Sequence, residues 1–417
     1  MVIKKEANII KIVFYAAMVF ALLYLVGYGL ISDNSPFRYV VFNLGNDSFT
    51  DFWDCVRDNI GNDPYAHSSS YPALACIFFG FFARQLQTID GVVSTDANIN
   101  QMMFVAYSLV LVSIFISLLN KRKRGESFEK TVFAIMMLLS APFIYMFERG
   151  NIISLALIFL MAYVFGKDSK NKWIREISYV CLGISAALKI YPAVFGLLLI
   201  KDKNYKAAVK VIIYGIAFFI IPFFAYHGIH DMKLMYGNMR MTGEIFQSTG
   251  VGGKVNIVPT LRVVLGLCGI DEIGYYIAGI FKILPYAYLL AAVIACMFHK
   301  SNWKVMTLLS SMIVLVPDFS FVYTLVFFII PLISFLDSKE KRTFVDWICL
   351  ACFIAIMIPI VHNPPELLAK FQAGFSYLFS TFIQGIAVLI MSIVLVTEGF
   401  VYGAIRLRRK NKQTKQC

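Results

Sequence analysis

The sequence predicts an all-α polytopic membrane protein, a bundle of about twelve transmembrane helices with an interfacial helix in the first external loop. Hydrophobic residues make up 59% of the 417 positions and the mean hydropathy is +0.72, both far above the values of soluble globular chains. The net charge of +13 comes from short Lys and Arg runs between apolar segments, as in cytoplasmic loops. This pattern indicates membrane topology, and no nucleic-acid partner is expected.

The first apolar segments alternate across the membrane when the basic runs are placed inside. Lys4 and Lys5 put the N-terminus in the cytoplasm. The first span, 9–31, is too long for the apolar region of a signal peptide and is expected to remain as an anchor. Residues 32–98 then form a polar and aromatic external loop, whose apolar insert 71–82 is too short to span and predicts an interfacial or re-entrant helix. The next predicted spans are 101–119, 132–147, 152–165, 177–188 and 193–200.

The second half of the chain continues the same alternation. Pro192 breaks the helix between two short spans, and residues 227–271 form a second external loop that is polar and Gly-rich. Residues 406–417 form a basic cytoplasmic tail. With no internal repeat and no soluble segment, 1–417 is predicted to be one transmembrane domain with both termini in the cytoplasm. The remaining predicted spans are 209–226, 273–298, 305–316, 321–336, 344–360 and 377–402.

Neither a metal site nor a cofactor is expected from the motifs. Cys349 and Cys352 have CxxC spacing, but they lie inside an apolar segment without a second pair, so they are interpreted as small hydrophobic residues. His227 and His230 are close to one carboxylate, Asp231, which is a weak metal pattern. No nucleotide-binding, dinucleotide-binding, hydrolase or metalloprotease motif occurs.

Ionisable side chains near membrane depth are costly, and under this topology six of them gather on the external side. Structural explanations stay open for all six. Asp51 and Asp54 could begin a solvated helix, with Thr50 or Asp51 as its N-cap. Glu148 and Arg149 could pair with each other in a tight turn at the glycine that follows. The six residues are Asp51, Asp54, Glu148, Arg149, Lys189 and Asp318.

The same residues fit a phosphate-dependent transfer reaction. Asp51 and Asp54 share a helix face at their spacing, and one of them could take a proton from an acceptor hydroxyl as general base. Arg149 could bind a phosphate bidentately. Lys189 breaks the positive-inside pattern and suits a phosphate partner, although its ammonium could instead snorkel. Asp318 could line a cavity or simply open the turn after a proline.

Aromatic side chains lie near these charges along the sequence and have two explanations. Tyr71, Tyr191, Trp53 and Tyr65 could stack on sugar faces. They could also sit in an interfacial aromatic belt, which is the more frequent role.

The order of motifs resembles glycosyltransferase family 87, which acts with polyprenol-phosphate sugars. Asp51-Phe-Trp, Asn62-Asp-Pro-Tyr65 and Tyr71-Pro-Ala-Leu74 are similar to the entrance of that family, DF…Y…G.D.Y…YPPL. The Arg149-Gly-Asn151 turn and the segment from Gly183 to Pro192 are similar to its central Gly-Asn turn and its G…AA.LK.YP motif. The family's external Asn-containing loop and its late helix pair resemble the surroundings of Asn256 and the range Pro317 to Pro331.

This resemblance implies a GT-C fold and a glycosyltransferase working at the outer face of the membrane. It implies that Asp51 is the general base and that Arg149 and Lys189 lie near the donor phosphate. Two departures concern the acceptor: Ala73 replaces the second Pro of YPP, and the late His of several members is absent. The other predicted substrate contacts are Asp54, Tyr71, Glu148, Asn151, Tyr191, Asn256 and Asp318.

The predicted function is inverting transfer of one hexose or pentose from a polyprenyl-phosphate donor to a lipid-linked glycan or envelope glycolipid in the cell membrane. Two alternatives stay open. A flippase for lipid-linked oligosaccharide should carry charges through the bundle interior and an internal repeat. A polysaccharide polymerase should have a larger late external loop, whereas here the longer polar loops are early and central.

Overall fold

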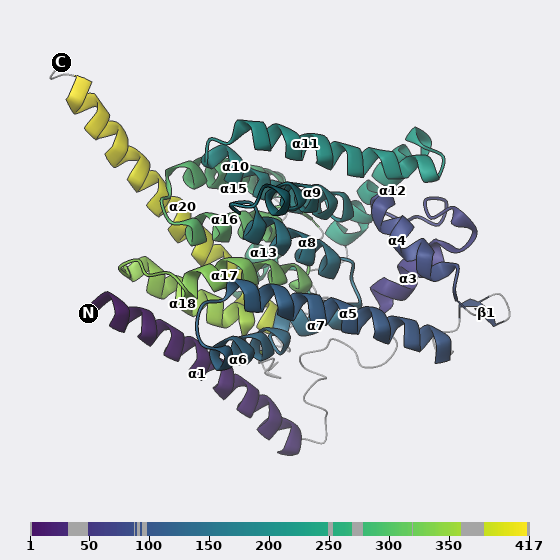
Figure 1. The fold of residues 1–417 in the computed structure, drawn as a ribbon, viewed down its shortest axis with the longest axis horizontal. Coiled ribbons are helices and arrows are strands. Elements are labelled where there is room, and N and C mark those ends of the chain that lie inside the picture. Colours follow the sequence, from purple (N-terminus) through teal and green to yellow (C-terminus); the bar gives the residue numbers. More distant parts are fainter. Residues whose placement is uncertain are drawn as a thin grey trace. The chain divides into compact units, whose positions relative to one another are not determined.

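The computed structural model describes residues 2–31, 49–86, 88–89, 92–93, 98–248, 253–268, 278–318, 320–359 and 379–414. Most of these residues are helical, as Figure 1 shows. The strands among them are β1 (Thr88–Ile89) and β2 (Val92–Val93), which pair as a short antiparallel hairpin. The structure therefore confirms the prediction of a helical polytopic chain.

The chain divides into two compact units. Unit 1 comprises Met1–Val40, Met136–Phe143 and Thr249–Cys417, and unit 2 comprises Val41–Ile135 and Ile144–Ser248. The expectation of a single domain stays a prediction. Unit 1 contains α1 (Val2–Ile31), α13 (Ile257–Leu267), α15 (Ala278–Phe298), α16 (Asn302–Leu315), η4 (Val322–Phe328), α17 (Ile329–Leu336), α18 (Phe344–Met357) and α20 (Phe379–Thr414). Unit 2 contains α3 (Thr50–Asp58), η1 (Ile60–Asn62), α4 (Ala73–Ala83), the hairpin, α5 (Asn98–Arg122), α8 (Ile153–Gly166), α9 (Lys172–Leu188), η2 (Tyr191–Gly196), α10 (Leu197–Lys201), α11 (Tyr205–Ile220), η3 (Ile221–Ala225) and α12 (Ile229–Ser248). The boundary falls within α6 (Ser127–Leu138) and α7 (Ala141–Arg149).

The centre of unit 2 is a stack in which α8 packs on α9 and α9 packs on α11. α8 carries no charged residue and buries most of its length, as expected for a helix that is apolar on every side. α9 begins after Asn171, whose side-chain oxygen accepts the backbone N–H of Trp173 at 2.9 Å as an N-cap. It ends at Leu188, and η2 follows with Pro192 in its first turn, so the predicted helix break is confirmed.

An aromatic cluster holds α3 in place within unit 2. Phe52 is 1% exposed, and its ring lies 5.0 to 5.8 Å from the rings of Trp53, Phe79, Phe82, Phe104 and Tyr107. Such ring pairs contribute about 0.5–1.5 kcal/mol each beyond their burial. Because the cluster draws on α3, α4 and α5, it fixes the start of α3, where Asp51 is found.

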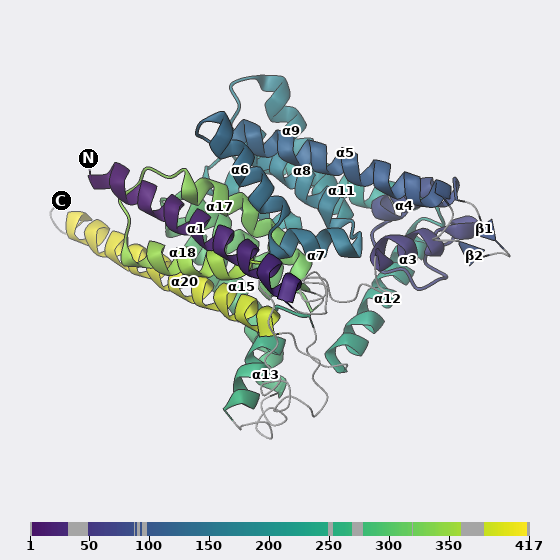
Figure 2. The same cartoon turned by 90° about the horizontal axis from the view of Figure 1, so that it is seen from below.

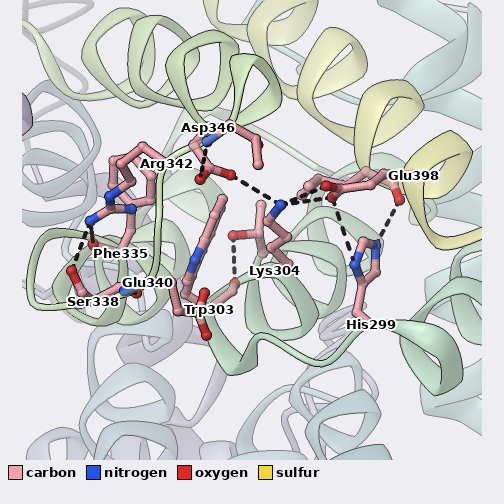
Figure 3. A network of polar contacts seen from close by, with 12 residues as sticks. His299, Trp303, Lys304, Phe335, Ser338, Glu340, Arg342, Asp346 and Glu398 are labelled. Carbon is pink, nitrogen blue, oxygen red and sulfur yellow. Dashed lines mark hydrogen bonds and ion pairs between the residues drawn. The ribbon is translucent and has the colours of Figure 1, made fainter. Parts of the chain in front are cut away.

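In unit 1, α1, α18 and α20 run alongside one another, as Figure 2 shows. α16 is buried along residues 303–315. A buried ion network lies where α16, α18 and α20 meet, and Figure 3 shows it. The Lys304 ammonium is 2.8 Å from both Glu398 carboxylate oxygens and 3.0 Å from one Asp346 oxygen. The His299 Nε2–H donates to the Leu395 carbonyl at 2.7 Å.

The network buries two basic residues that follow α15. His299 and Lys304 are 2% and 5% exposed. Carboxylates from α18 and α20, far away in sequence, make that burial possible because buried charges need partners. Arg342 is buried as well, with its Nη2 donating to the Phe335 and Ser338 carbonyls at the end of α17.

The described helices differ from the predicted spans in length. Five of the described helices are long and apolar enough to cross a membrane, and α6 and α7 taken together as one span would make a sixth. The pair is bent by 54°, so the span expected at 132–147 is not one straight helix. The other apolar helices are 10 to 17 residues long, and the total of about twelve spans stays a prediction. The five are Glu6–Gly27, Asn98–Arg122, Tyr205–Ala225, Phe281–Phe298 and Thr381–Arg406.

The two predicted external loops contain helices. The apolar insert at 71–82 forms α4, as expected, although its interfacial position stays a prediction. The loop predicted at 227–271 contains α12 and α13, and its external position stays a prediction. Its polar and Gly-rich composition concealed the helical spacing of a few apolar positions such as Met232 and Met235 on α12, which pack against Phe223.

Gly183 sets how closely α9 approaches α11. A Cβ at this position would lie 2.9 Å from the Tyr214 Cβ and 3.0 Å from its backbone carbon, whereas a Cβ at Gly215 would meet nothing within 4 Å. We expect Gly183→Ala to lose about 1–3 kcal/mol of stability through overpacking. Gly215→Ala, the matched control, should keep or raise stability because Ala favours helix. Thermal unfolding midpoints in detergent check this, and equal midpoints would contradict it.

Candidate active site

The start of α3 is tied to the end of α7. Phe49 precedes α3 with a left-handed backbone, φ 59°, and its N–H donates to the Glu148 carbonyl at 2.6 Å. Phe49 is therefore the N-cap residue, and no side chain caps the helix, so the alternative with Thr50 or Asp51 as N-cap was wrong. This backbone bond places Asp51 next to the turn that follows α7.

Both carboxylate oxygens of Asp51 accept hydrogen bonds. Oδ1 accepts from Arg149, from Nε at 3.1 Å and also from Nη2, and Oδ2 accepts from the Asn151 Nδ2 at 2.6 Å. The Asp51 and Arg149 side chains are 15% and 23% exposed, so the pair is shielded but reachable from solvent. Arg149 thus pairs with a residue 98 positions away, and the alternative in which it pairs with Glu148 instead was wrong.

The turn between α7 and α8 depends on Gly150. Its φ is +62°, a backbone conformation that favours glycine. A Cβ at this position would also lie only 2.8 Å from the Phe52 Cβ, which is too close. The next residue, Asn151, is 1% exposed and is held at both ends of its amide. Its Oδ1 accepts the Ile153 N–H at 3.0 Å, which fixes the Nδ2 toward Asp51.

Tyr71 and Lys189 complete the group from two further elements. The Asn151 Nδ2 also donates to the Tyr71 hydroxyl at 3.3 Å. The Lys189 Nζ lies 4.2 Å from the centre of the Tyr71 ring, a cation–π contact. Lys189 follows the last residue of α9 with an extended backbone, so its side chain leaves the helix beside the loop that precedes α4.

Cys55 lies one turn after Asp51 on α3 and is 4% exposed. Burial raises the pKa of the Cys55 thiol well above its usual value, and the nearby Asp51 carboxylate raises it further. The thiol is therefore neutral near pH 7 and unsuited to act as a nucleophile.

The remaining predicted residues have other surroundings or partners. Asp54 is exposed and bonds to Arg57 one turn later, so it does not share the hydrogen bonds of Asp51 despite sharing a helix. Glu148 is buried, and Tyr191 begins η2. In unit 1, the Asn256 Nδ2 donates to the carbonyls of Pro317 and Asp318 at 3.0 and 3.3 Å. The Asp318 residue itself is exposed.

Three supporting residues were not anticipated. The Ser154 hydroxyl donates to the Asn151 carbonyl at 2.9 Å and lies 2.9 Å from the Tyr107 hydroxyl. Phe49 shapes the start of α3. Spacing and composition could not predict the roles of Ser154, Tyr107 and Phe49, because each role depends on contacts between elements far apart in the chain.

The assembled group has a definite chemical capacity. One carboxylate, one guanidinium and one ammonium share a half-buried place in unit 2, with an amide fixing the carboxylate. The guanidinium and the ammonium can bind an anion such as a phosphate beside a carboxylate base. Residues from α3, the turn after α7, the loop before α4 and the end of α9 contribute to it.

Comparison with known proteins adds a family match. The family model described as glycosyltransferase family 87 matches residues 70–317, which is more than half of the chain. The match includes Tyr71, Arg149, Asn151 and Lys189, and it begins after Asp51. No curated protein and no solved structure match the chain.

A double-mutant cycle measures the Asp51–Arg149 interaction. Using Asp51→Asn and Arg149→Gln, we expect a coupling free energy of about 1–3 kcal/mol, because removing one partner leaves the other shielded and uncompensated. The Asp54–Arg57 pair, with both side chains 51% exposed, should give less than about 1 kcal/mol. Unfolding free energies in detergent provide the readout, and equal coupling in the two pairs would contradict the central role of Asp51 and Arg149.

Proposed function

The chain belongs to glycosyltransferase family 87 and is a membrane glycosyltransferase, and on that premise we propose that it transfers a sugar from a polyprenyl-phosphate donor to a lipid-linked glycan or envelope glycolipid. The observation that carries the proposal is the hydrogen-bonded group of Asp51, Arg149 and Asn151 with Lys189 beside it. It combines a carboxylate base with two cations for a phosphate.

Asp51 is the proposed general base. The acceptor hydroxyl oxygen attacks the anomeric carbon from the face opposite the phosphate and forms the new glycosidic bond with inversion. The bond between that carbon and the phosphate oxygen breaks, its electron pair stays on the phosphate, and the hydroxyl proton passes to the Asp51 carboxylate. Asn151 keeps the carboxylate oriented through its 2.6 Å hydrogen bond.

Arg149 is proposed to change partners when the donor binds. In the structure its guanidinium donates to Asp51 Oδ1, so this oxygen is already engaged and is not open to an acceptor hydroxyl. A donor phosphate competes for the same bidentate guanidinium. Moving Arg149 from Asp51 to the phosphate would free one carboxylate oxygen and stabilise the leaving group in a single step.

Lys189 is proposed to stabilise the charge that develops on the departing phosphate. Its ammonium covers one face of Tyr71, so that face is taken by the cation and is not open to a sugar ring. Tyr71 then acts by positioning Lys189 and by accepting a hydrogen bond from Asn151. Glu148, Tyr191, Asn256 and Asp318 remain proposed substrate contacts without an assigned step, and Asp54 drops out of the proposed mechanism.

The proposed location of the reaction is the outer face of the cell membrane, with both chain termini in the cytoplasm. The basic runs beside the apolar segments support this orientation. A flippase and a polysaccharide polymerase are the competing functions. They are distinguished by whether a single sugar is transferred and by whether that transfer needs Asp51.

Asp51→Asn tests the base. The variant should lower the rate of sugar transfer about 100- to 10,000-fold because the amide cannot accept the proton. Donor binding should persist. Asp58→Asn, on the same helix, is the matched control and should behave as the wild type. Radiolabelled polyprenyl-phosphate sugars separated by thin-layer chromatography give the rate. Unchanged transfer by Asp51→Asn would show that Asp51 is not the base, and no transfer by the wild type would favour a flippase.

Arg149→Lys tests the change of partner. Lysine keeps the charge but cannot bind phosphate bidentately, so the KM for the donor should rise roughly 10- to 100-fold. Arg57→Lys on α3 controls for loss of an arginine near the same loop. Steady-state kinetics over a donor series measure the effect. A donor KM equal to that of the wild type would show that Arg149 serves Asp51 alone.

A further inference from the structure

Three potential metal ligands meet in unit 2 outside the group around Asp51. Asp63 follows η1, His227 lies between η3 and α12, and Asp231 is in the first turn of α12. One ligand atom from each lies within 4.8 Å of the other two. The sequence shows His227 and Asp231 together, but Asp63 joins them only through the fold.

The two carboxylate oxygens of Asp231 differ in their hydrogen bonding. It is fully buried, and its Oδ2 accepts the His227 backbone N–H at 2.9 Å and lies 3.2 Å from the His227 Nδ1. Its Oδ1 is buried and has no hydrogen-bond partner among the residues that the structure describes. A carboxylate oxygen removed from water without a partner is costly, and a bound cation removes that cost.

We propose that Asp63, His227 and Asp231 bind a divalent transition-metal ion, with Zn²⁺ as the best fit. One imidazole nitrogen with two carboxylate oxygens is a donor set that Zn²⁺ accepts, whereas Ca²⁺ and Mg²⁺ prefer oxygen alone. Ligands at Zn²⁺ distances in a tetrahedron lie roughly 3.3 Å apart. The three ligand atoms already lie within 4.8 Å of one another, so a small approach brings them to that spacing. Water would fill the fourth position.

The loop that carries Asp63 is already held by Asn238 of α12 and by Tyr226, which precedes α12. The Asn238 Nδ2 donates to the carbonyls of Tyr65 and Ser69 at 3.1 and 3.0 Å. The Tyr226 hydroxyl donates to the Asn59 side-chain oxygen at 3.3 Å. These bonds hold the loop on both sides of Asp63 and bring the carboxylate to α12.

The ion would add a third attachment between α12 and the loop that carries Asp63. The same loop ends at Tyr71, which contacts Asn151 and Lys189. The metal therefore acts as a positioning element for the segment 59–71. The proposed metal site uses its own contacts and does not depend on which sugar or acceptor the protein uses. It replaces the expectation from the sequence that no metal binds.

The experiment measures zinc directly. The full chain, purified in detergent, is stripped with a chelator, loaded with ZnCl₂, dialysed and analysed by elemental mass spectrometry. Wild type should retain about one Zn²⁺ per chain, and His227→Ala and Asp63→Asn should retain less than a fifth of that. His230→Ala is the matched control, because this exposed histidine lies one residue from Asp231 outside the group and should keep full binding.

A second measurement separates metal binding from simple structural effects. Zn²⁺ should raise the thermal unfolding midpoint of the stripped wild type and of His230→Ala, but not that of His227→Ala. Asp63 and His227 are not buried, so their variants should still fold. Equal zinc retention by wild type and His227→Ala would overturn the proposal. So would equal stabilisation by Ca²⁺, since that points to an oxygen-only site.

Discussion

The hydrogen bonds from Arg149 and Asn151 to Asp51 are the interaction on which the site depends. They join α3 to a turn nearly a hundred residues later. The turn can deliver both donors only because Gly150 adopts a positive φ against Phe52. The aromatic cluster around Phe52 in turn fixes the register of α3, so packing and hydrogen bonding support the same placement of the carboxylate.

Two of the charged networks among the described residues differ in how exposed they are. Around Lys304 in unit 1, the ammonium is enclosed by Asp346 and Glu398, and all three side chains are at most 11% exposed. Exchange of partners there would leave a buried charge uncompensated, which is strongly unfavourable. Asp51 and Arg149 in unit 2 are more open to solvent. In the proposed mechanism an incoming phosphate competes for the guanidinium, and this exposure permits the exchange.

The segment 59–71 links this site to the proposed metal site. One end of the segment follows α3, and the other ends at Tyr71 beside Lys189. Between them, side chains of η3 and α12 hold backbone and side-chain groups of the loop, and Asp63 approaches His227 and Asp231. Order in this loop and the position of Lys189 are thus coupled through short contacts within a single unit.

The sequence by itself determined the membrane class, most helix positions in the described ranges, the helix break at Pro192 and the glycine-dependent turn after Arg149. These features follow from apolar composition, local periodicity and backbone preference, which are properties of neighbouring residues. Only the tertiary structure decided that Asp51 and Asp54, three residues apart, have different partners, that α6 and α7 meet at a 54° bend, and that Asp63 reaches α12. The physical reason is that such pairings depend on how distant helices pack, and no local pattern in the chain records that packing.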